Sequence, residues 1–381
     1  MLCYSVYSKN HRKFTWEIGD VMRVLQIVAD GKPGGGTTHV LQILKGLRHA
    51  VSFHLITEEQ SYLMKEAGAL GIPCQGLRFF ISRLNPAIPF QLRALVMALQ
   101  PDLVHVHGGR AGFFFALSLL KIPMVYTVHG FHFIEKSPRI RRMALIAERW
   151  NLRRACHSIF VSKYDVVLAE NFQLLSGSAK RSVIYPGLPL KNLPPPLPQA
   201  LPHIGFIGRL EHQKDPLLFV EMMEFLPEYS ATIVGDGALA PMIKQEIASR
   251  ELGGRVHMVG ELSHSEALEI LATFNVVVLT SRWEGLPVLV LESMGIGVPV
   301  VSMNVSGLEE IIHDGVNGML VEKRRGEALA EKVKIITNNE DFRISLIKKA
   351  QETIQEKFSI ETMMASILEI YQEMSAVHAG H

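Results

Sequence analysis

The sequence is poor in cysteine. Its 381 residues contain three, Cys3, Cys74 and Cys156, and none lies in a CxxC motif or in a cluster of cysteine and histidine. This pattern argues against a disulfide framework and against a zinc site. Scarce, unpaired cysteine is typical of a reducing compartment, so we expect a cytoplasmic protein.

Long hydrophobic segments are also missing. The longest apolar run, AGFFFALSLL, has ten residues, whereas a membrane-spanning helix needs about 20, so we do not expect an integral membrane protein. The N-terminal MLCYSVYSKNHRKFTWEIGD lacks the apolar centre of a signal peptide. Residues 1–21 are predicted to be either a disordered leader or a segment upstream of the physiological start. The net charge of +2 gives no sign of nucleic-acid binding over the whole surface.

What the sequence does contain is a regular alternation of strand-like and helical segments. Short β-branched runs such as RVLQIVAD alternate with segments of helical period such as THVLQILKGL. This alternation predicts parallel sheets covered by helices on both faces. It is interrupted at residues 185–202, YPGLPLKNLPPPLPQALP, where seven prolines in eighteen residues exclude a helix or an inner strand.

A chain of this length is expected to form two domains. We predict an α/β protein with two Rossmann-like, doubly wound domains, residues 22–186 and 203–356, facing a central cleft. A semi-rigid, proline-rich linker joins them over residues 187–202, and a C-terminal helix over 357–381 is expected to pack back toward the N-terminal domain. Because parallel sheets bind ligands beyond the carboxyl ends of their strands, we sought candidate residues in the loops that follow strands.

The loop after RVLQIVAD is rich in glycine. In GKPGGGTTHV, Gly35 and Gly36 precede a helix. Glycines allow close approach of the backbone, and free amides at a helix start attract phosphate. A tight turn between strand and helix explains the same residues equally well.

Two further strands of the first half end in histidines. His129 and His132 follow the strand MVYTV, where a histidine can polarise a reacting group or merely cap the strand. His105 and His107 lie inside DLVHVHGG and are predicted to pack at the end of the sheet.

In the second half, cations follow one strand and carboxylates surround the end of another. Arg209 and Lys214 in IGFIGRLEHQK suit a diphosphate, although an ordinary solvated loop also contains such residues. In SRWEGLPVLVLES, Pro287 is predicted to lie in the first turn of a helix. Glu284 then precedes the helix and Glu292 lies inside it, among apolar neighbours where an unpaired carboxylate would be costly.

Together these motifs resemble the retaining GT4 glycosyltransferases of GT-B architecture. EGLPVLVLE has their E-x7-E spacing, and GRLEHQK and GGGTTHV match in order. The segment DLVHVHGGRAGFFFALSLLKIPMVYTVHGFHF is similar to the subset that builds capsule, exopolysaccharide or lipopolysaccharide. The resemblance runs from about Arg23 to Tyr371.

The resemblance implies a role for each matching residue of the second domain, which would bind a nucleotide sugar. Glu292 would hold the ribose hydroxyls and Glu284 the hydroxyls of the transferred sugar. Arg209 and Lys214 would grip the diphosphate and stabilise its charge as it leaves. The backbone amides that would face a phosphate at the positive end of the helix belong to Gly285 and Leu286.

It implies roles elsewhere too. Gly35 and Gly36 would approach the diphosphate from the first, acceptor-side domain, and His129 would lie beside the sugar near the reacting carbon. The turn from Gly260 to Leu262 would flank the nucleotide base.

The activity implied is transfer of a sugar from a nucleotide diphosphate, UDP- or GDP-linked, to a saccharide or polyprenyl-linked acceptor with retained configuration. No metal and no further cofactor are expected, and the sequence has no DxD-type acidic cluster after a strand. Two alternatives stay open: a sugar-nucleotide epimerase on the same frame, and a non-catalytic nucleotide-sugar-binding protein. The missing GxGxxG motif argues against a dinucleotide oxidoreductase.

Some positions depart from the family pattern. PGLP, residues 186–189, replaces a common NG-containing hinge, and Thr37 stands where an acid is frequent. Ser306 replaces a glycine and is predicted to cap a helix.

A basic region also stands out in the first half, within KSPRIRRMALIAERWNLRRA. Apolar Met143, Ile146, Ala147 and Trp150 interleave with its cations. Such a helix either lies on an anionic membrane as a peripheral contact or forms an ordinary solvated face. The cations are Lys136, Arg139, Arg141, Arg142, Arg149, Arg153 and Arg154.

Overall fold

The protein divides into two compact units in the computed structural model, which describes residues 21–80, 86–131, 137–175, 180–197, 202–284, 286–305 and 307–379. The first unit takes Met1–Gly187 and Ile360–His381, and the second takes Leu188–Ser359. The predicted leader lies outside the described residues except for Val21. Also outside the described residues are His132, Lys136, Gly285, Ser306, residues 198–201 of the predicted linker and residues 380–381 of the predicted C-terminal helix. Among the described helices, none has the length and apolarity to cross a membrane.

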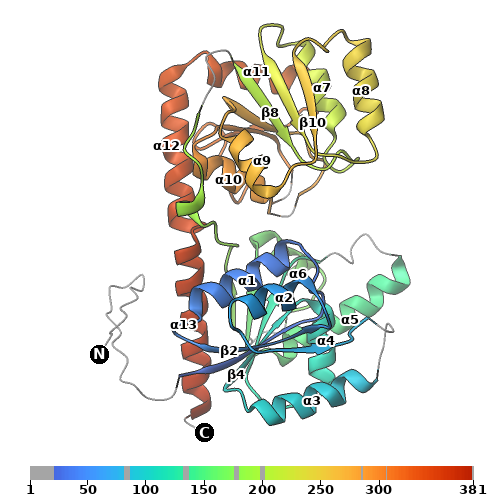
Figure 1. The fold of residues 1–381 in the computed structure, drawn as a ribbon, viewed down its shortest axis with the longest axis vertical. Helices are drawn as coiled ribbons and strands as arrows, with labels where there is room; N and C mark the ends of the chain where they lie inside the picture. Colours follow the sequence, from blue (N-terminus) through green and yellow to red (C-terminus); the bar gives the residue numbers. More distant parts are fainter. Residues whose placement is uncertain are drawn as a thin grey trace. The chain divides into compact units, whose positions relative to one another are not determined.

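The first unit is built on a seven-stranded sheet in the order β3-β2-β1-β4-β5-β6-β7 (Figure 1). All neighbours are parallel. The chain runs outward from β1 in one direction and then returns to place β4 on the other side of it, so the topology reverses between β1 and β4. The strands are β1 Arg23–Val28, β2 Ser52–Glu58, β3 Cys74–Leu77, β4 Leu103–His107, β5 Met124–Val128, β6 His157–Phe160 and β7 Lys180–Val183.

Helices cover both faces of this sheet, because its central strands β1, β4, β5 and β6 are buried along almost their whole length. One core joins β-strand residues with α3, α4 and α5, as Leu92, Phe114 and Leu152 show. The other joins the sheet with α1, α2 and the last helix α13. Tyr371 of α13 is fully buried there. The helices are α1 Gly35–Leu47, α2 Tyr62–Ala69, α3 Ala87–Leu99, α4 Gly109–Leu117, α5 Pro138–Arg154, α6 Lys163–Asn171 and α13 Ile360–Ala379.

The second unit has a six-stranded parallel sheet in the order β10-β9-β8-β11-β12-β13 (Figure 1). Its topology reverses between β8 and β11. The strands are β8 His203–Ile207, β9 Ser230–Val234, β10 Val256–Gly260, β11 Val276–Leu279, β12 Val300–Met303 and β13 Met319–Val321. The helices are α7 Pro216–Glu224, α8 Ala240–Ser249, α9 His264–Leu271, α10 Val288–Ile296, α11 Gly326–Thr337 and α12 Glu340–Lys357, with the short 3-10 helix η1 Leu190–Asn192.

Part of the segment predicted as a linker packs as an ordinary piece of the second unit. The amide of Leu188 donates to the carbonyl of Phe358 at 2.7 Å. A Cβ added at Gly295 of α10 would lie 2.7 Å from Leu193 and 2.9 Å from Leu188, so these leucines rest directly on that helix. The boundary between the units falls after residue 187, and Leu188, before the proline run, is buried in the second unit.

Candidate active site

The loops after β8 and β11 meet where the topology of the second unit reverses, which is the usual ligand position in such sheets. Lys214, after β8, forms an ion pair with Glu284, after β11, at 2.6 Å between Nζ and Oε1. Ser281 donates to the same carboxylate oxygen at 2.6 Å. Glu284 is 8% exposed, and the Lys214 side chain is 23% exposed. Two residues that lie 70 positions apart in the sequence thus share one site.

Arg209 lies at the open side of the same loop. Its side chain is 65% exposed and forms an ion pair with Glu211 at 3.0 Å. It also donates to Gln213 Oε1 at 3.2 Å, and Gln213 in turn donates to the carbonyl of Trp283. The guanidinium is therefore linked through one side chain to the residue next to Glu284, and its exposure leaves it accessible to an anion.

Arg324, which the sequence analysis missed, fastens the two loops together. It follows β13 and donates to the carbonyls of Thr280 and Ser281 at 2.8 and 2.6 Å, and it pairs with Asp215 at 2.9 Å. Thr280 Oγ1 donates in turn to the carbonyls of Lys214 and Asp215. The sequence signal that could have identified Arg324 is its position two residues after the strand-like run GMLVE.

Asp215 has an unusual backbone in this arrangement. Its φ is +47°, a left-handed conformation that costs free energy for a residue with a side chain. Arg282 and Arg324 both pair with its carboxylate Oδ2, at 2.8 and 2.9 Å. These two ion pairs stabilise the turn and so hold the backbone from which the Lys214 side chain extends.

Glu292 lies inside α10, in contact with the start of α9. It is the fifth residue of α10 and is 8% exposed. Burial raises the pKa of its carboxyl to about 7. Its Oε1 lies 3.3 Å from His264 Nε2 at the start of α9, and that histidine side chain is 73% exposed. Among the contacts of the described residues, none joins Glu292 to Glu284.

The helix α10 starts one residue later than predicted. Pro287 precedes it as the N-cap with ψ 113°, and Val288 is its first residue. The prediction that Pro287 lies in the first turn is therefore wrong, although Glu284 does precede the helix. Leu286 is half-buried before the helix start, and Gly285 lies outside the described residues.

The turn after β10 is shaped by glycine and by a helix cap. Gly260 has φ +79° and lies at a register shift of the strand. Leu262 is half-buried, and Ser263 then caps α9 through a reciprocal capping box with Glu266. The turn from Gly260 to Leu262 therefore lies between a glycine in the left-handed region and a capped helix start.

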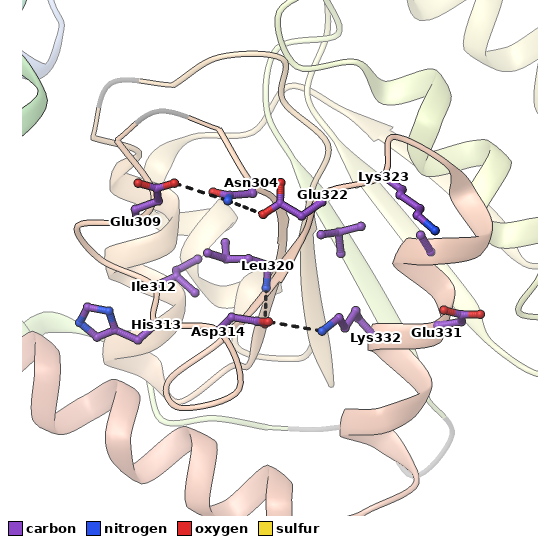
Figure 2. Close-up of a pocket in the computed structure, with 12 residues that line it drawn as sticks. Asn304, Glu309, Ile312, His313, Asp314, Leu320, Glu322, Lys323, Glu331 and Lys332 are labelled. Atoms are coloured by element: carbon purple, nitrogen blue, oxygen red, sulfur yellow. Dashed lines mark hydrogen bonds and ion pairs between the residues drawn. The ribbon is translucent and has the colours of Figure 1, made fainter.

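A hollow of about 620 Å³ lies elsewhere in the second unit, beside the carboxyl ends of β12 and β13 (Figure 2). Asn304 donates to Glu322 at 2.7 Å, and Asp314 accepts from the amide of Leu320 and pairs with Lys332 at 3.5 Å. None of the predicted site residues lines it, and several of its polar groups are already paired. We assign it no role.

In the first unit, the candidate residues meet at the reversal between β1 and β4. A Cβ added at Gly36 would lie 3.6 Å from the ring of His129, whereas one added at Gly35 would meet nothing within 4 Å. Gly35 and Gly36 are the first two residues of α1, so the prediction that they precede the helix is wrong. The helix start and the histidine after β5 are adjacent. His129 Nε2 lies 3.1 Å from His107 Nδ1. His107 was predicted only to pack at the end of the sheet, but it also makes a hydrogen bond with His129.

His39 of α1, which the sequence analysis did not single out, joins this group. Its ring centroid lies 5.2 Å from that of His129 and 6.2 Å from that of His107. Burial lowers its pKa to about 4, so it is neutral near pH 7. Neither ring nitrogen has a hydrogen-bond partner within the described part of the chain.

Two family models match the chain, one over each half. Glycosyltransferase Family 4 matches residues 33–192, and Glycosyl transferases group 1 matches residues 194–353. An uncharacterized glycosyltransferase of Methanocaldococcus jannaschii is 26% identical over 356 residues, which cover 90% of this chain and 95% of that protein. A UDP-Gal:alpha-D-GlcNAc-diphosphoundecaprenol alpha-1,3-galactosyltransferase of Escherichia coli is also 26% identical and covers 88% and 95%.

Solved structures show the same fold. HepE of Anabaena, in complex with UDP, superposes with a TM-score of 0.80 at 20% identity and covers 92% of this chain and 100% of that chain. Among the described residues, no group of three or more histidine, cysteine, aspartate or glutamate side chains is placed to hold a metal ion.

Proposed function

Because the chain belongs to the family 4, group 1 glycosyltransferases of GT-B fold, we propose that it transfers a sugar, with retained configuration, from a nucleotide diphosphate sugar to an acceptor hydroxyl. A UDP- or GDP-linked donor and a saccharide or polyprenyl-linked acceptor of cell-surface polysaccharide synthesis are proposed. The diphosphoundecaprenol named for the Escherichia coli relative and the UDP bound by HepE support these choices. Retention of configuration rests on the resemblance of EGLPVLVLE.

The observation that carries the proposal is the Lys214–Glu284 pair at the reversal of the second sheet. A leaving nucleotide diphosphate gains negative charge, and a fixed ammonium group stabilises that charge best in a partly buried site. Lys214 is such a group, because Glu284 and the loop fastened by Arg324 hold it in place. Arg209, more exposed, adds a second positive charge.

The carboxylates are proposed to bind hydroxyls. Glu284 would accept hydrogen bonds from the transferred sugar, and Glu292 from the ribose. A buried carboxylate without full partners gains most from such donors. The raised pKa of Glu292 indicates that its local partner, the exposed His264, leaves much of its desolvation uncompensated.

In the first unit, Gly35 and Gly36 are proposed to approach the diphosphate, and His129 to contact the transferred sugar. The adjacency of Gly36 and His129 supports this assignment. We further propose that the positive charge for the leaving group comes from Arg209 and Lys214, without a metal ion. Activity that is unchanged after treatment with a chelator is the expected result.

The donor can be identified by thermal denaturation of the full chain with a panel of nucleotide sugars. A ligand present at 100 times its dissociation constant stabilises the folded state by about 2.7 kcal/mol. The donor that stabilises is then incubated with lipid-linked and free saccharides, and the product is analysed by NMR. A new glycosidic bond with the donor's anomeric configuration supports the proposal. Conversion of the donor without any acceptor would indicate an epimerase, and binding without turnover a non-catalytic protein.

Peripheral membrane contact is proposed for α5. Its exposed apolar residues are Ile140, Met143, Ile146 and Trp150. Exposed arginines flank them, namely Arg139, Arg141, Arg142 and Arg153. Arg154 does not belong to this surface, because it donates to the carbonyls of Leu120 and Ile122.

Apolar side chains beside cations suit a membrane with anionic headgroups. The test is sedimentation with anionic vesicles, using neutral vesicles as the control. Binding that survives replacement of Arg139, Arg141 and Arg142 by alanine would contradict this part of the proposal.

A further inference from the structure

A chain of buried hydrogen bonds lies behind His129 and reaches the last helix of the protein. His107 Nδ1 lies 3.1 Å from His129 Nε2, and His107 Nε2 lies 2.7 Å from Gln26 Oε1. Gln26 Nε2 donates to the hydroxyl of Tyr371 at 2.9 Å, and that hydroxyl lies 2.6 Å from His105 Nδ1. Side chains from β1, β4 and α13 are thus connected to the histidine that follows β5.

The two partners of the Gln26 amide fix where the ring protons of His107 and His129 lie. Gln26 Oε1 can only accept, so His107 carries its proton on Nε2 and leaves Nδ1 as an acceptor. His129 must then donate from Nε2 to His107. The hydroxyl of Tyr371 accepts from Gln26 Nε2 and so holds the amide with its oxygen toward His107.

Burial keeps the chain neutral. Gln26, His105 and Tyr371 are completely buried, and His107 is 4% exposed. Burial and the neighbouring histidines lower the pKa values of His105 and His107 well below their usual range. Burial also raises the pKa of the Tyr371 hydroxyl. His39 from α1 and His107 from β4 lie against the His129 ring, and His105 and Tyr371 follow behind His107.

We propose that Gln26 and Tyr371 are positioning residues for His129, and that they act through His107 to hold the His129 ring in one orientation with its proton on Nε2. A ring that is oriented before a ligand arrives does not have to be ordered during binding. What His129 contacts rests on the proposed function, whereas its tautomer does not. The inference also gives α13 a task beyond packing, since Tyr371 connects the end of the chain to this site.

The tautomer can be measured directly on the full chain. The protein is labelled with ¹⁵N-histidine, and the two-bond ¹H–¹⁵N spectrum distinguishes protonated from unprotonated ring nitrogens. The His129 signals are identified by comparison with His129→Asn. At pH 7.5 we expect His129 to be protonated on Nε2. Gln26→Leu removes the acceptor for His107, so both tautomers of His129 should then be seen.

Tyr371→Phe provides a second, more conservative variant, which removes one hydroxyl and keeps the ring in the core. It should shift His129 toward a mixture as well. Thr127→Val is the matched control, because Thr127 Oγ1 lies 2.7 Å from His105 Nε2, the ring nitrogen that does not face Tyr371, and within the described residues it is hydrogen-bonded to neither Gln26 nor His107 through its side chain. It should leave the His129 signals unchanged. Melting temperatures of all variants show which of them fold.

Turnover provides the second arm. With the donor found by thermal denaturation, Gln26→Leu and Tyr371→Phe are expected to lower kcat about tenfold while KM for the donor stays within about twofold. Conversely, a His129 proton on Nδ1 in the wild type, or a tautomer unaffected by both variants, would overturn the inference. A changed tautomer with unchanged turnover would support the positioning and overturn instead the role proposed for His129.

Discussion

The two units bury polar groups at the ends of their strands in different ways. The second unit uses permanent charges in pairs, as in Lys214 with Glu284 and Asp215 with Arg324. The first unit uses the histidines of β4, which burial keeps neutral, and connects them through an amide and a hydroxyl. Ionised side chains at these strand ends are stabilised by oppositely charged partners, whereas histidine, with a pKa of about 6.5 in water, readily becomes neutral when water is removed.

This difference matches the tasks proposed for the two units. A diphosphate that departs with negative charge needs fixed positive charge, which Lys214 and Arg209 supply. A neutral sugar needs orientation, which a fixed neutral ring supplies. The comparison therefore predicts that substitutions in the second unit change how well negative charge on the diphosphate is stabilised. Substitutions in the first unit should change how the sugar is oriented.

The largest effect is expected for Lys214→Ala. The change removes the partly buried ammonium group, so kcat/KM should fall about 10²- to 10³-fold. The buried carboxylate of Glu284 loses its ion-pair partner, which should cost about 1–3 kcal/mol of stability because Lys214 is itself partly exposed. Steady-state kinetics and thermal denaturation measure the two losses. Combining Lys214→Met with Glu284→Gln should restore most of the stability and none of the activity; restored activity would show that the pair is only structural.

Glu292→Gln should weaken donor binding about tenfold or more, because a charged acceptor is lost.

Glu292 also makes the stability of the protein depend on pH in a defined direction. The folded pKa of about 7 lies above the ordinary 4.5, so the folded protein binds the proton more tightly than the unfolded chain. Stability is then lost as pH rises through the window from 4.5 to 7, and the loss persists above it. The variant should accordingly be more stable than the wild type at pH 8, by up to about 3 kcal/mol.

Glu148 of α5 provides a matched control for Glu292. Burial raises its pKa to about 7 as well, and its carboxylate accepts from the Tyr126 hydroxyl at 2.7 Å. Glu148→Gln should show the same gain in stability at pH 8 with unchanged donor binding. If both variants bind the donor equally well, the role given to Glu292 is wrong.

Arg324→Ala should lower kcat/KM about tenfold, since the loops that carry Lys214 and Glu284 lose their shared donor. The effect should appear mainly in kcat if the clamp positions groups that act on the leaving diphosphate. Arg325→Ala is the control, because that neighbouring side chain is exposed. Equal kinetics for the two variants would remove Arg324 from the site.

The smallest effect is expected for Gly35→Ala, which should increase stability and weaken donor binding. The added Cβ meets nothing within 4 Å, and alanine favours the helix, so the unliganded protein should gain up to about 1 kcal/mol. Donor binding should weaken about threefold if a phosphate approaches this backbone. Gly68→Ala in α2 has equally open surroundings and should stabilise without changing binding. Unchanged affinity in Gly35→Ala would argue against phosphate at this helix start.

The sequence predicted the two parallel sheets well, because strands buried on both faces are short, continuous apolar runs. It also predicted that cations and carboxylates would follow β8 and β11. It did not predict Arg324, whose partners are backbone carbonyls far away in the chain. It placed Pro287 one residue too far into α10, since proline suits both the N-cap and the first turn. Leu188 and Leu193 were predicted to be linker residues, because only the tertiary structure shows that both pack against Gly295.

The amino-acid sequence by itself determined which chemical groups stand at the strand ends, since strand period and loop position are local properties. It could not determine which of those groups touch. Lys214 meets Glu284 across 70 residues, and Gln26 meets Tyr371 across 345. Such pairings depend on strand order and on where the last helix packs, and these are settled only when the whole chain buries its apolar surface.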